Sequence, residues 1–169
     1  MFELSEKVMS SLSFQDQLEK CKDYGDVFEV VKRAVKQSLN RERAGLMLYL
    51  GDLPVHVGAF HGVGSNGIVL NKRLIRLISF RSATELNSYV FMLLLHEYLH
   101  SLGYIDERQV RKLVYDICRD SFGKDHPATQ FAYSPPVPRI PPSELQPGNV
   151  DRQLEIVKDF DRSNLSYIS

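Results

Sequence analysis

Residues 94–100 read LLHEYLH, which sets two histidines and a glutamate within an apolar segment. Residues four positions apart share one face of an α-helix, so His96 and His100 can direct their imidazoles at one point. Two imidazoles at this spacing can supply half of the ligands of a zinc ion. Glu97 lies beside them and could act as a general base on a metal-bound water. The segment therefore predicts a catalytic zinc site on a helix.

The alternative interpretation is a pair of histidines that bind no metal and are hydrogen-bonded within the fold. Two features of the sequence favour the metal. Glu97 directly follows the apolar run 91–95, and a charged side chain is rarely buried without a partner. Gly103 stands three residues after His100, where the helix must end and the chain must turn.

The composition is that of one domain with a substantial core, since 43% of the 169 residues are hydrophobic. The 21 basic and 21 acidic residues balance, so neither nucleic acid nor an anionic membrane is an expected partner. Two cysteines are too few for a disulfide framework. No segment has the apolar length of a membrane span, and the first residues do not resemble a signal peptide. We therefore expect a cytoplasmic protein.

The segment before the motif changes from helical to strand-like patterning. An apolar stripe at helical spacing predicts a helix over residues 26–39, preceded by a shorter helix over 13–21. Residues 74–78 fit either a short helix or a further strand. Short apolar runs bounded by glycine and proline predict strands over residues 45–50, 55–60 and 68–71.

The helix that carries the motif has recognisable ends. Ser82 and Glu85 have the spacing of a capping box, which predicts a helix over residues 83–102. Gly103 is a natural stop for it. A further amphipathic helix is predicted over residues 106–123.

The composition changes after Tyr133. Residues 134–142 read SPPVPRIPP, which is incompatible with a helix or a central strand and predicts an extended segment. Beyond it, apolar residues at helical spacing predict a short amphipathic helix over residues 150–160. We therefore expect a catalytic domain over residues 1–133, followed over 134–169 by a proline-rich strap and a short C-terminal helix.

A catalytic zinc ion commonly has three protein ligands, and Asp106 is the leading candidate to join His96 and His100. It completes the spacing HExxHxxGxxD, in which aspartate stands where the long zinc-protease pattern has its third histidine. Asp106 also fits the N-cap of the next helix, a role that the same carboxylate could fill instead. Glu107, one residue into that helix, and His126, beyond it, remain alternatives.

With this motif, its helix and the strands upstream, the chain resembles the zincin metalloproteases, and among them the small, minimal zincin-type proteins. The resemblance rests on residues 83–106. It extends to helix 26–39 as a backing helix and to residues 68–71 as the strand at the edge of the cleft. It implies an α+β fold with a small twisted mixed sheet, a backing helix and an active-site helix.

The resemblance implies that His96 and His100 bind Zn2+, that Glu97 activates the attacking water, and that the substrate is a peptide or protein extended along the edge strand. The chain departs from the metzincin branch, which has a methionine-containing turn after its third ligand, because all four methionines here precede Asp106. In the glutamate branch, the third ligand stands further along the chain than Glu107 does here.

A second resemblance belongs to a different class. Residues 99–104, LHSLGY, are similar to the metal site of the bacterial rRNA-maturation endoribonucleases, whose three histidines occupy the first, fifth and eleventh positions. Asp106 takes the eleventh position here. Those proteins have glycine where this chain has Glu97, and they tend to display a basic groove. We therefore predict a zinc-dependent peptidase, with two alternatives: a metal-dependent single-strand endoribonuclease, and a non-catalytic zinc-stabilised binding module held latent by its tail.

Overall fold

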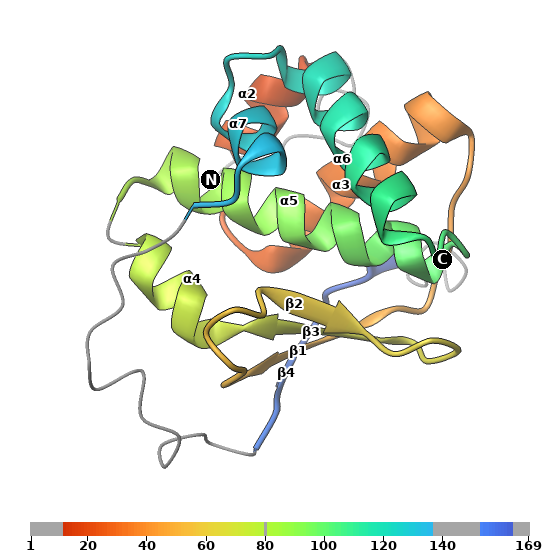
Figure 1. Cartoon of the computed structure of the whole chain (residues 1–169), viewed down its shortest axis with the longest axis vertical. Helices are drawn as coiled ribbons and strands as arrows, with labels where there is room; N and C mark the ends of the chain where they lie inside the picture. Colours follow the sequence, from red (N-terminus) through yellow and green to blue (C-terminus); the bar gives the residue numbers. More distant parts are fainter. Residues whose placement is uncertain (1–11, 80, 137–152, 164–169) are drawn as a thin grey trace.

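The computed structural model describes residues 12–79, 81–136 and 153–163 of the chain (Figure 1). Within these ranges the fold is α+β, with helices stacked on one face of a small mixed sheet. The predicted fold class is confirmed at this level. Among the described residues, no helix combines the length and the apolarity needed to cross a membrane.

The sheet has four strands in the order β2-β3-β1-β4. Strands β1 and β3 are parallel, whereas β2 pairs antiparallel with β3 and β4 pairs antiparallel with β1. One edge of the sheet is therefore β2, and the other is β4. The strands comprise β1 (Met47–Gly51), β2 (Ala59–His61), β3 (Gly67–Asn71) and β4 (Glu155–Val157).

Helix α5 is the centre of the molecule and contacts both the sheet and the surrounding helices. Every residue from Ser88 to Leu99 except His96 is buried, as expected for a helix enclosed on all sides. Its predicted cap is confirmed, because the Ser82 side chain accepts a hydrogen bond from the Glu85 amide. The helices comprise α2 (Phe14–Glu19), α3 (Tyr24–Leu39), α4 (Lys72–Ser79), α5 (Ala83–Ser101), α6 (Glu107–Phe122) and α7 (Pro127–Tyr133).

The C-terminal segment differs from its prediction. Residues 155–157, which fall in the predicted helix over residues 150–160, form strand β4 on the open edge of β1. Phe160 then stacks on Phe28 of α3, with 4.2 Å between the ring centroids. The prediction of a helix was wrong for these residues because the free hydrogen-bonding edge of β1 lies about a hundred residues away in sequence and is invisible to local periodicity. Residues 153–154 and 158–160 of that predicted helix are not helical either, whereas residues 150–152 and residues 137–142 of the extended segment lie outside the described residues.

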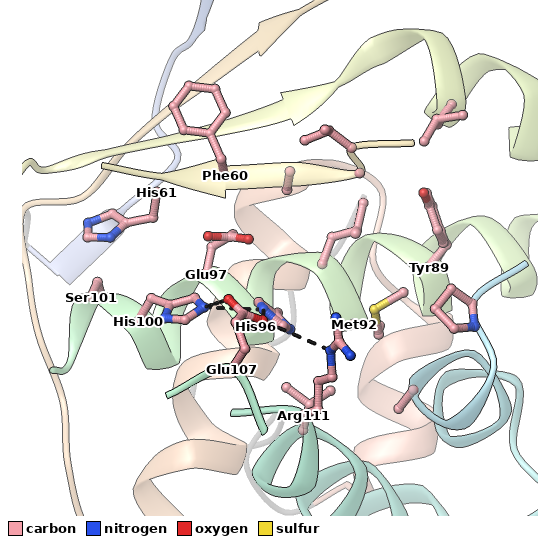
Figure 2. A pocket seen from close by; sticks show the side chains of 18 of the residues that line it. Phe60, His61, Tyr89, Met92, His96, Glu97, His100, Ser101, Glu107 and Arg111 are labelled. Carbon is pink, nitrogen blue, oxygen red and sulfur yellow. Dashed lines mark hydrogen bonds and ion pairs between the residues drawn. The ribbon is translucent and has the colours of Figure 1, made fainter. Parts of the chain in front are cut away.

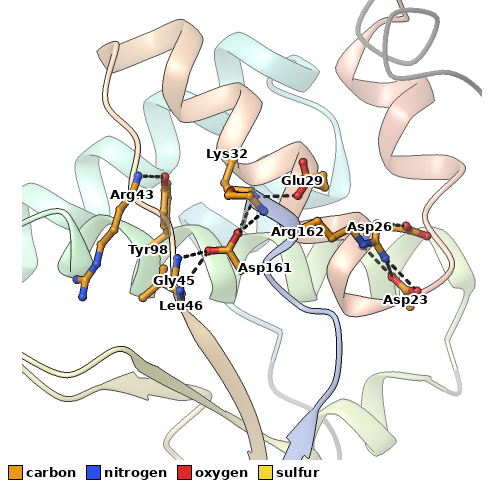
Figure 3. A network of polar contacts seen from close by, with 11 residues as sticks. Asp23, Asp26, Glu29, Lys32, Arg43, Gly45, Leu46, Tyr98, Asp161 and Arg162 are labelled. Carbon is orange, nitrogen blue, oxygen red and sulfur yellow. Dashed lines mark hydrogen bonds and ion pairs between the residues drawn. The ribbon is translucent and has the colours of Figure 1, made fainter. Parts of the chain in front are cut away.

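A buried carboxylate fastens this segment to the rest of the fold (Figure 3). Asp161 accepts hydrogen bonds from the backbone amides of Gly45 and Leu46, at 2.8 and 3.1 Å, and from Lys32 Nζ at 3.0 Å. Its side chain is 2% exposed. Burial alone would raise the pKa of Asp161, but hydrogen bonds from Ser163 and Lys32 outweigh it and lower that pKa.

We expect Asp161→Ala to lower the free energy of unfolding by about 2–4 kcal/mol, because it leaves Lys32 and two amides without their acceptor. Since the folded-state pKa of Asp161 is lowered, its contribution is present at neutral pH and is lost as the pH falls through that pKa. Urea unfolding at pH 7 and at about pH 3 tests both points: the difference between wild type and variant should shrink in acid. Asp120→Ala is the control, because an exposed pair such as Asp120–Arg119 contributes at most about 1 kcal/mol. Equal losses in the two variants at neutral pH would contradict the assigned role.

Candidate metal centre

Three side chains converge at the C-terminal end of α5. His96 and His100 come from successive turns of α5, and Glu107 is the first residue of α6. His96 Nε2 lies 3.1 Å from Glu107 Oε2, and His100 Nε2 lies 2.7 Å from Glu107 Oε1. One ligand atom from each of the three residues lies within 4.8 Å of the others (Figure 2). The arrangement could hold a metal ion.

The turn between the two helices orients His100. Gly103 adopts a φ of 104°, a left-handed conformation that favours glycine, and the chain reverses there. The reversal brings the Tyr104 carbonyl to His100, whose Nδ1 donates to it at 2.8 Å. With its proton on Nδ1, a neutral His100 presents the lone pair of Nε2 toward the Glu107 carboxylate. Two acceptors 2.7 Å apart share a proton, and a tetrahedral metal ion between them would require the carboxylate to lie about 0.6 Å further from Nε2, since its ligand atoms are about 3.3 Å apart.

The spacing of the nitrogens fits zinc. Two nitrogens bound at about 2.0–2.1 Å to a tetrahedral zinc ion lie about 3.3 Å apart. The Nε2 atoms of His96 and His100 are 3.3 Å apart. Two imidazoles and one carboxylate are also a donor set that zinc accepts, with a fourth position left for water or substrate.

Glu97 is the other charged group of this site. Its carboxylate lies between α5 and β2, within the same pocket as the two histidines (Figure 2). Glu97 is only 6% exposed, and burial, opposed by the charge of His100 and reinforced by that of Glu107, raises its pKa to about 7. A carboxylate with a pKa near neutrality can both accept and return a proton at physiological pH.

Burial shifts the pKa of His96 in the opposite direction to that of Glu97. Burial is the largest influence on His96 and lowers its pKa; the Glu107 charge opposes this, and the His100 charge adds to it. Lowering the pKa favours the neutral imidazole, which is the form that binds a metal. Arg111, one turn after Glu107 on α6, has its Nε atom 4.0 Å from Glu107 Oε2 and borders the pocket.

The structure brings Glu107, rather than Asp106, to the two histidines. Asp106 is the N-cap of α6 and accepts hydrogen bonds from the amides of Arg108 and Gln109, at 2.8 and 3.3 Å. A carboxylate turned toward its own helix in this way is directed away from the histidines. The N-cap motif in the sequence could have distinguished Asp106 from Glu107. It assigns Asp106 to capping α6 and makes Glu107 the first residue of that helix.

The other candidate ligand, His126, lies outside the cluster. It is the N-cap of α7, where its Nδ1 accepts a hydrogen bond from the Ala128 amide at 3.1 Å. Its ring stacks on Phe122 at the far end of α6, with 4.6 Å between centroids. His126 therefore has a structural role in this fold.

The cluster of His96, His100 and Glu107 opens into a pocket of about 1040 Å³ between α5 and β2. Around the three converging side chains, the pocket wall includes the polar residues His61, Glu97 and Arg111 as well as apolar residues. Toward the N-terminal half of α5 it becomes apolar, and here the sequence alone gave no indication of a binding site. The apolar portion is lined by Val57, Leu74, Tyr89, Met92, Leu93, Pro135 and Pro136.

Comparisons of the chain with protein-family models, with curated proteins and with solved structures found no match.

We expect the wild-type protein to bind about one zinc ion per chain, as measured by elemental analysis after dialysis. Glu107→Ala removes a ligand and should weaken zinc binding by more than the roughly 10–100-fold that loss of an outer-shell partner costs. Asp106→Asn is the matched control, since asparagine caps a helix as well as aspartate does. A chelator competition that finds zinc weakened by the Asp106 variant and unchanged by the Glu107 variant would reverse the assignment.

Proposed function

We propose that this protein is a zinc-dependent peptidase of the zincin type. One observation supports the proposal above the others: two imidazoles and a carboxylate converge on one point, and Glu97 lies in the same pocket with a pKa of about 7. The residue order of the zincin motif thus coincides with a spatial arrangement suited to its chemistry. His96, His100 and Glu107 are the proposed ligands.

A zinc ion bound there would polarise a substrate carbonyl and lower the pKa of a water molecule. Glu97 removes the proton from the attacking water and returns it to the nitrogen of the leaving amine. His100 keeps its Nε2 directed at the centre through its bond to the Tyr104 carbonyl. Burial of Glu97 supports this role, because it raises the affinity of the carboxylate for the proton it must take up.

Among the described strands β2 is at an edge of the sheet, and its outer side is the proposed binding site for the substrate backbone. The Asn71 amide donates to the Gly58 carbonyl at 2.9 Å, and the register pairs Phe60 with Val69. Because bonded pairs alternate along an antiparallel ladder, the backbone groups of Ala59 and His61 point away from β3, toward the open edge. A peptide extended along this edge can add a strand to the sheet.

The side chains of β2 also support the binding of a peptide along this strand. Phe60 lies on the outer face of the sheet, whereas His61 projects toward α5 (Figure 2). Ala59 shares the inner face with His61 by strand alternation and leaves space above the apolar part of the pocket. A substrate side chain opposite Ala59 would enter the apolar portion lined by Leu93 and Tyr89. We therefore propose that peptides with a large apolar residue at this position are preferred.

Glu97→Gln tests the catalytic role. We expect peptide hydrolysis to fall by about 10²–10⁴-fold, because the amide cannot accept a proton, while zinc remains bound. Glu85→Gln, on the same helix but paired with Arg81, is the matched control and should stay active. Turnover and zinc content are measured on the same preparations. Full activity of the Glu97 variant would refute the proposed base, and chelator-sensitive cleavage of single-stranded RNA in place of peptides would favour an endoribonuclease.

Ala59→Pro tests the use of the β2 edge. Proline removes an N–H that points to the open edge and leaves the bonds between β2 and β3 in place. We expect the KM for an extended peptide to rise by about 2–10-fold, the value of one hydrogen bond. Ala59→Ser, which keeps the amide, should behave like the wild type. An unchanged KM in the proline variant, with its circular dichroism intact, would place the substrate elsewhere.

A further inference from the structure

Two exposed apolar side chains border the metal end of the pocket. Val63 belongs to the loop between β2 and β3, and Ile105 to the loop between α5 and α6. They are 87% and 69% exposed, and both line the pocket that contains the metal centre. Large apolar groups left in water at the rim of a pocket commonly mark a binding surface. Neither residue belongs to the apolar portion at the other end, near Leu93.

The loop that carries Val63 is held in place by hydrogen bonds. His61 Nε2 donates to the Ser65 carbonyl at 2.9 Å. Arg43 donates to the side-chain oxygen of Asn66 at 2.6 Å and to the Ser101 carbonyl, at the end of α5, at 2.7 Å. Arg43 therefore joins the loop directly to the helix that carries the metal ligands. The position of Val63 beside the pocket is thus fixed by the fold.

The backbone of Ile105 is fixed by the turn between α5 and α6. It lies between Tyr104, whose carbonyl binds His100, and Asp106, which caps α6. The backbone on both sides of Ile105 is therefore fixed by the same turn that assembles the metal centre. The turn uses only backbone and cap groups, and the Ile105 side chain stays exposed at the pocket.

We infer that Val63 and Ile105 form an apolar clamp for a side chain of the peptide substrate. The inference rests on the proposed peptidase function and adds a second specificity site to it. Strand β2 runs from Ala59 to His61 and continues into the loop of Val63, so a peptide antiparallel to β2 reaches the clamp with its N-terminal part. The clamp therefore selects an apolar residue on the N-terminal side of the residue opposite His61, and the pocket near Leu93 selects one on its C-terminal side.

The test measures binding separately from turnover, with the zinc-loaded Glu97→Gln protein. The probes are fluorescent peptides of serine and threonine with one fixed leucine for the apolar portion of the pocket. A second leucine is placed at each of several positions N-terminal to the first. Anisotropy titrations give Kd for each peptide. We expect one spacing to lower Kd by about tenfold, the effect of burying part of a leucine side chain.

Val63→Ser combined with Ile105→Ser should abolish this optimum and leave the affinity for the single-leucine peptide unchanged. Ile156→Ser is the matched control, because Ile156 is an exposed apolar residue on β4, at the opposite edge of the sheet. If the preferred leucine spacing persists in the double variant, the clamp is overturned. The clamp is also overturned if the protein without these two substitutions binds the peptides but shows no preferred spacing. Spacing-dependent binding without hydrolysis by the unsubstituted protein would support the clamp and refute the peptidase. Absence of any peptide binding would refute both.

Discussion

Between His100 and Glu107 the chain reverses within a few residues, and the candidate site depends on how it does so. Gly103 permits the backbone to turn, and the next residue presents its carbonyl to His100 Nδ1. That bond assigns the proton of the imidazole and directs the other nitrogen at Glu107. One turn thus sets both the position of the third side chain and the chemical form of the second.

The burial of α5 gives this turn a rigid base. Apart from His96, the helix is enclosed from Ser88 to Leu99, so the start of its last turn cannot move without disturbing the core. Enclosure also has an electrostatic consequence, since it places Glu97 where a carboxylate is poorly solvated and raises its pKa. The same packing that stabilises the fold therefore adjusts the proton affinity of the proposed base.

Much of this fold can be predicted from local patterns. The helix over residues 26–39, the strand over 68–71 and the capped motif helix are confirmed because each depends on a periodicity or a cap within its own segment. The expected position of strand 68–71 at the edge of the cleft was wrong, because β3 lies between β2 and β1 and β2 forms the edge. Strand β4 depends instead on the distant edge of β1, which no window of sequence contains. Helix α7 was missed because its short segment has a weak periodic signal, although Pro127 at its first turn is a typical start.

The candidate site, like the fold, could be predicted only where it depends on a local pattern. The pair of histidines and Glu97 follow from spacing on one helix, whereas the third side chain depends on the direction in which a carboxylate points at a helix start. Asp106 and Glu107 are adjacent, and only the cap geometry separates them. The pocket and its exposed rim could not be predicted because they arise from the approach of β2 to α5, two elements joined by no local pattern.

Contacts from outside the motif hold the end of α5 as well. Arg41 Nη2 donates to the Leu102 carbonyl at 2.6 Å, and the Arg43 amide donates to the Tyr98 hydroxyl at 2.9 Å. The same segment, through Gly45 and Leu46, is bound by Asp161 near the C-terminal end of the described chain (Figure 3). Residues 41–46 therefore join the C-terminal segment to the C-terminal end of α5, with hydrogen bonds to α5 at one end and to Asp161 at the other. The C-terminal segment supports the site by restraining residues 41–46. These residues in turn hydrogen-bond the end of α5 and the loop that carries Val63.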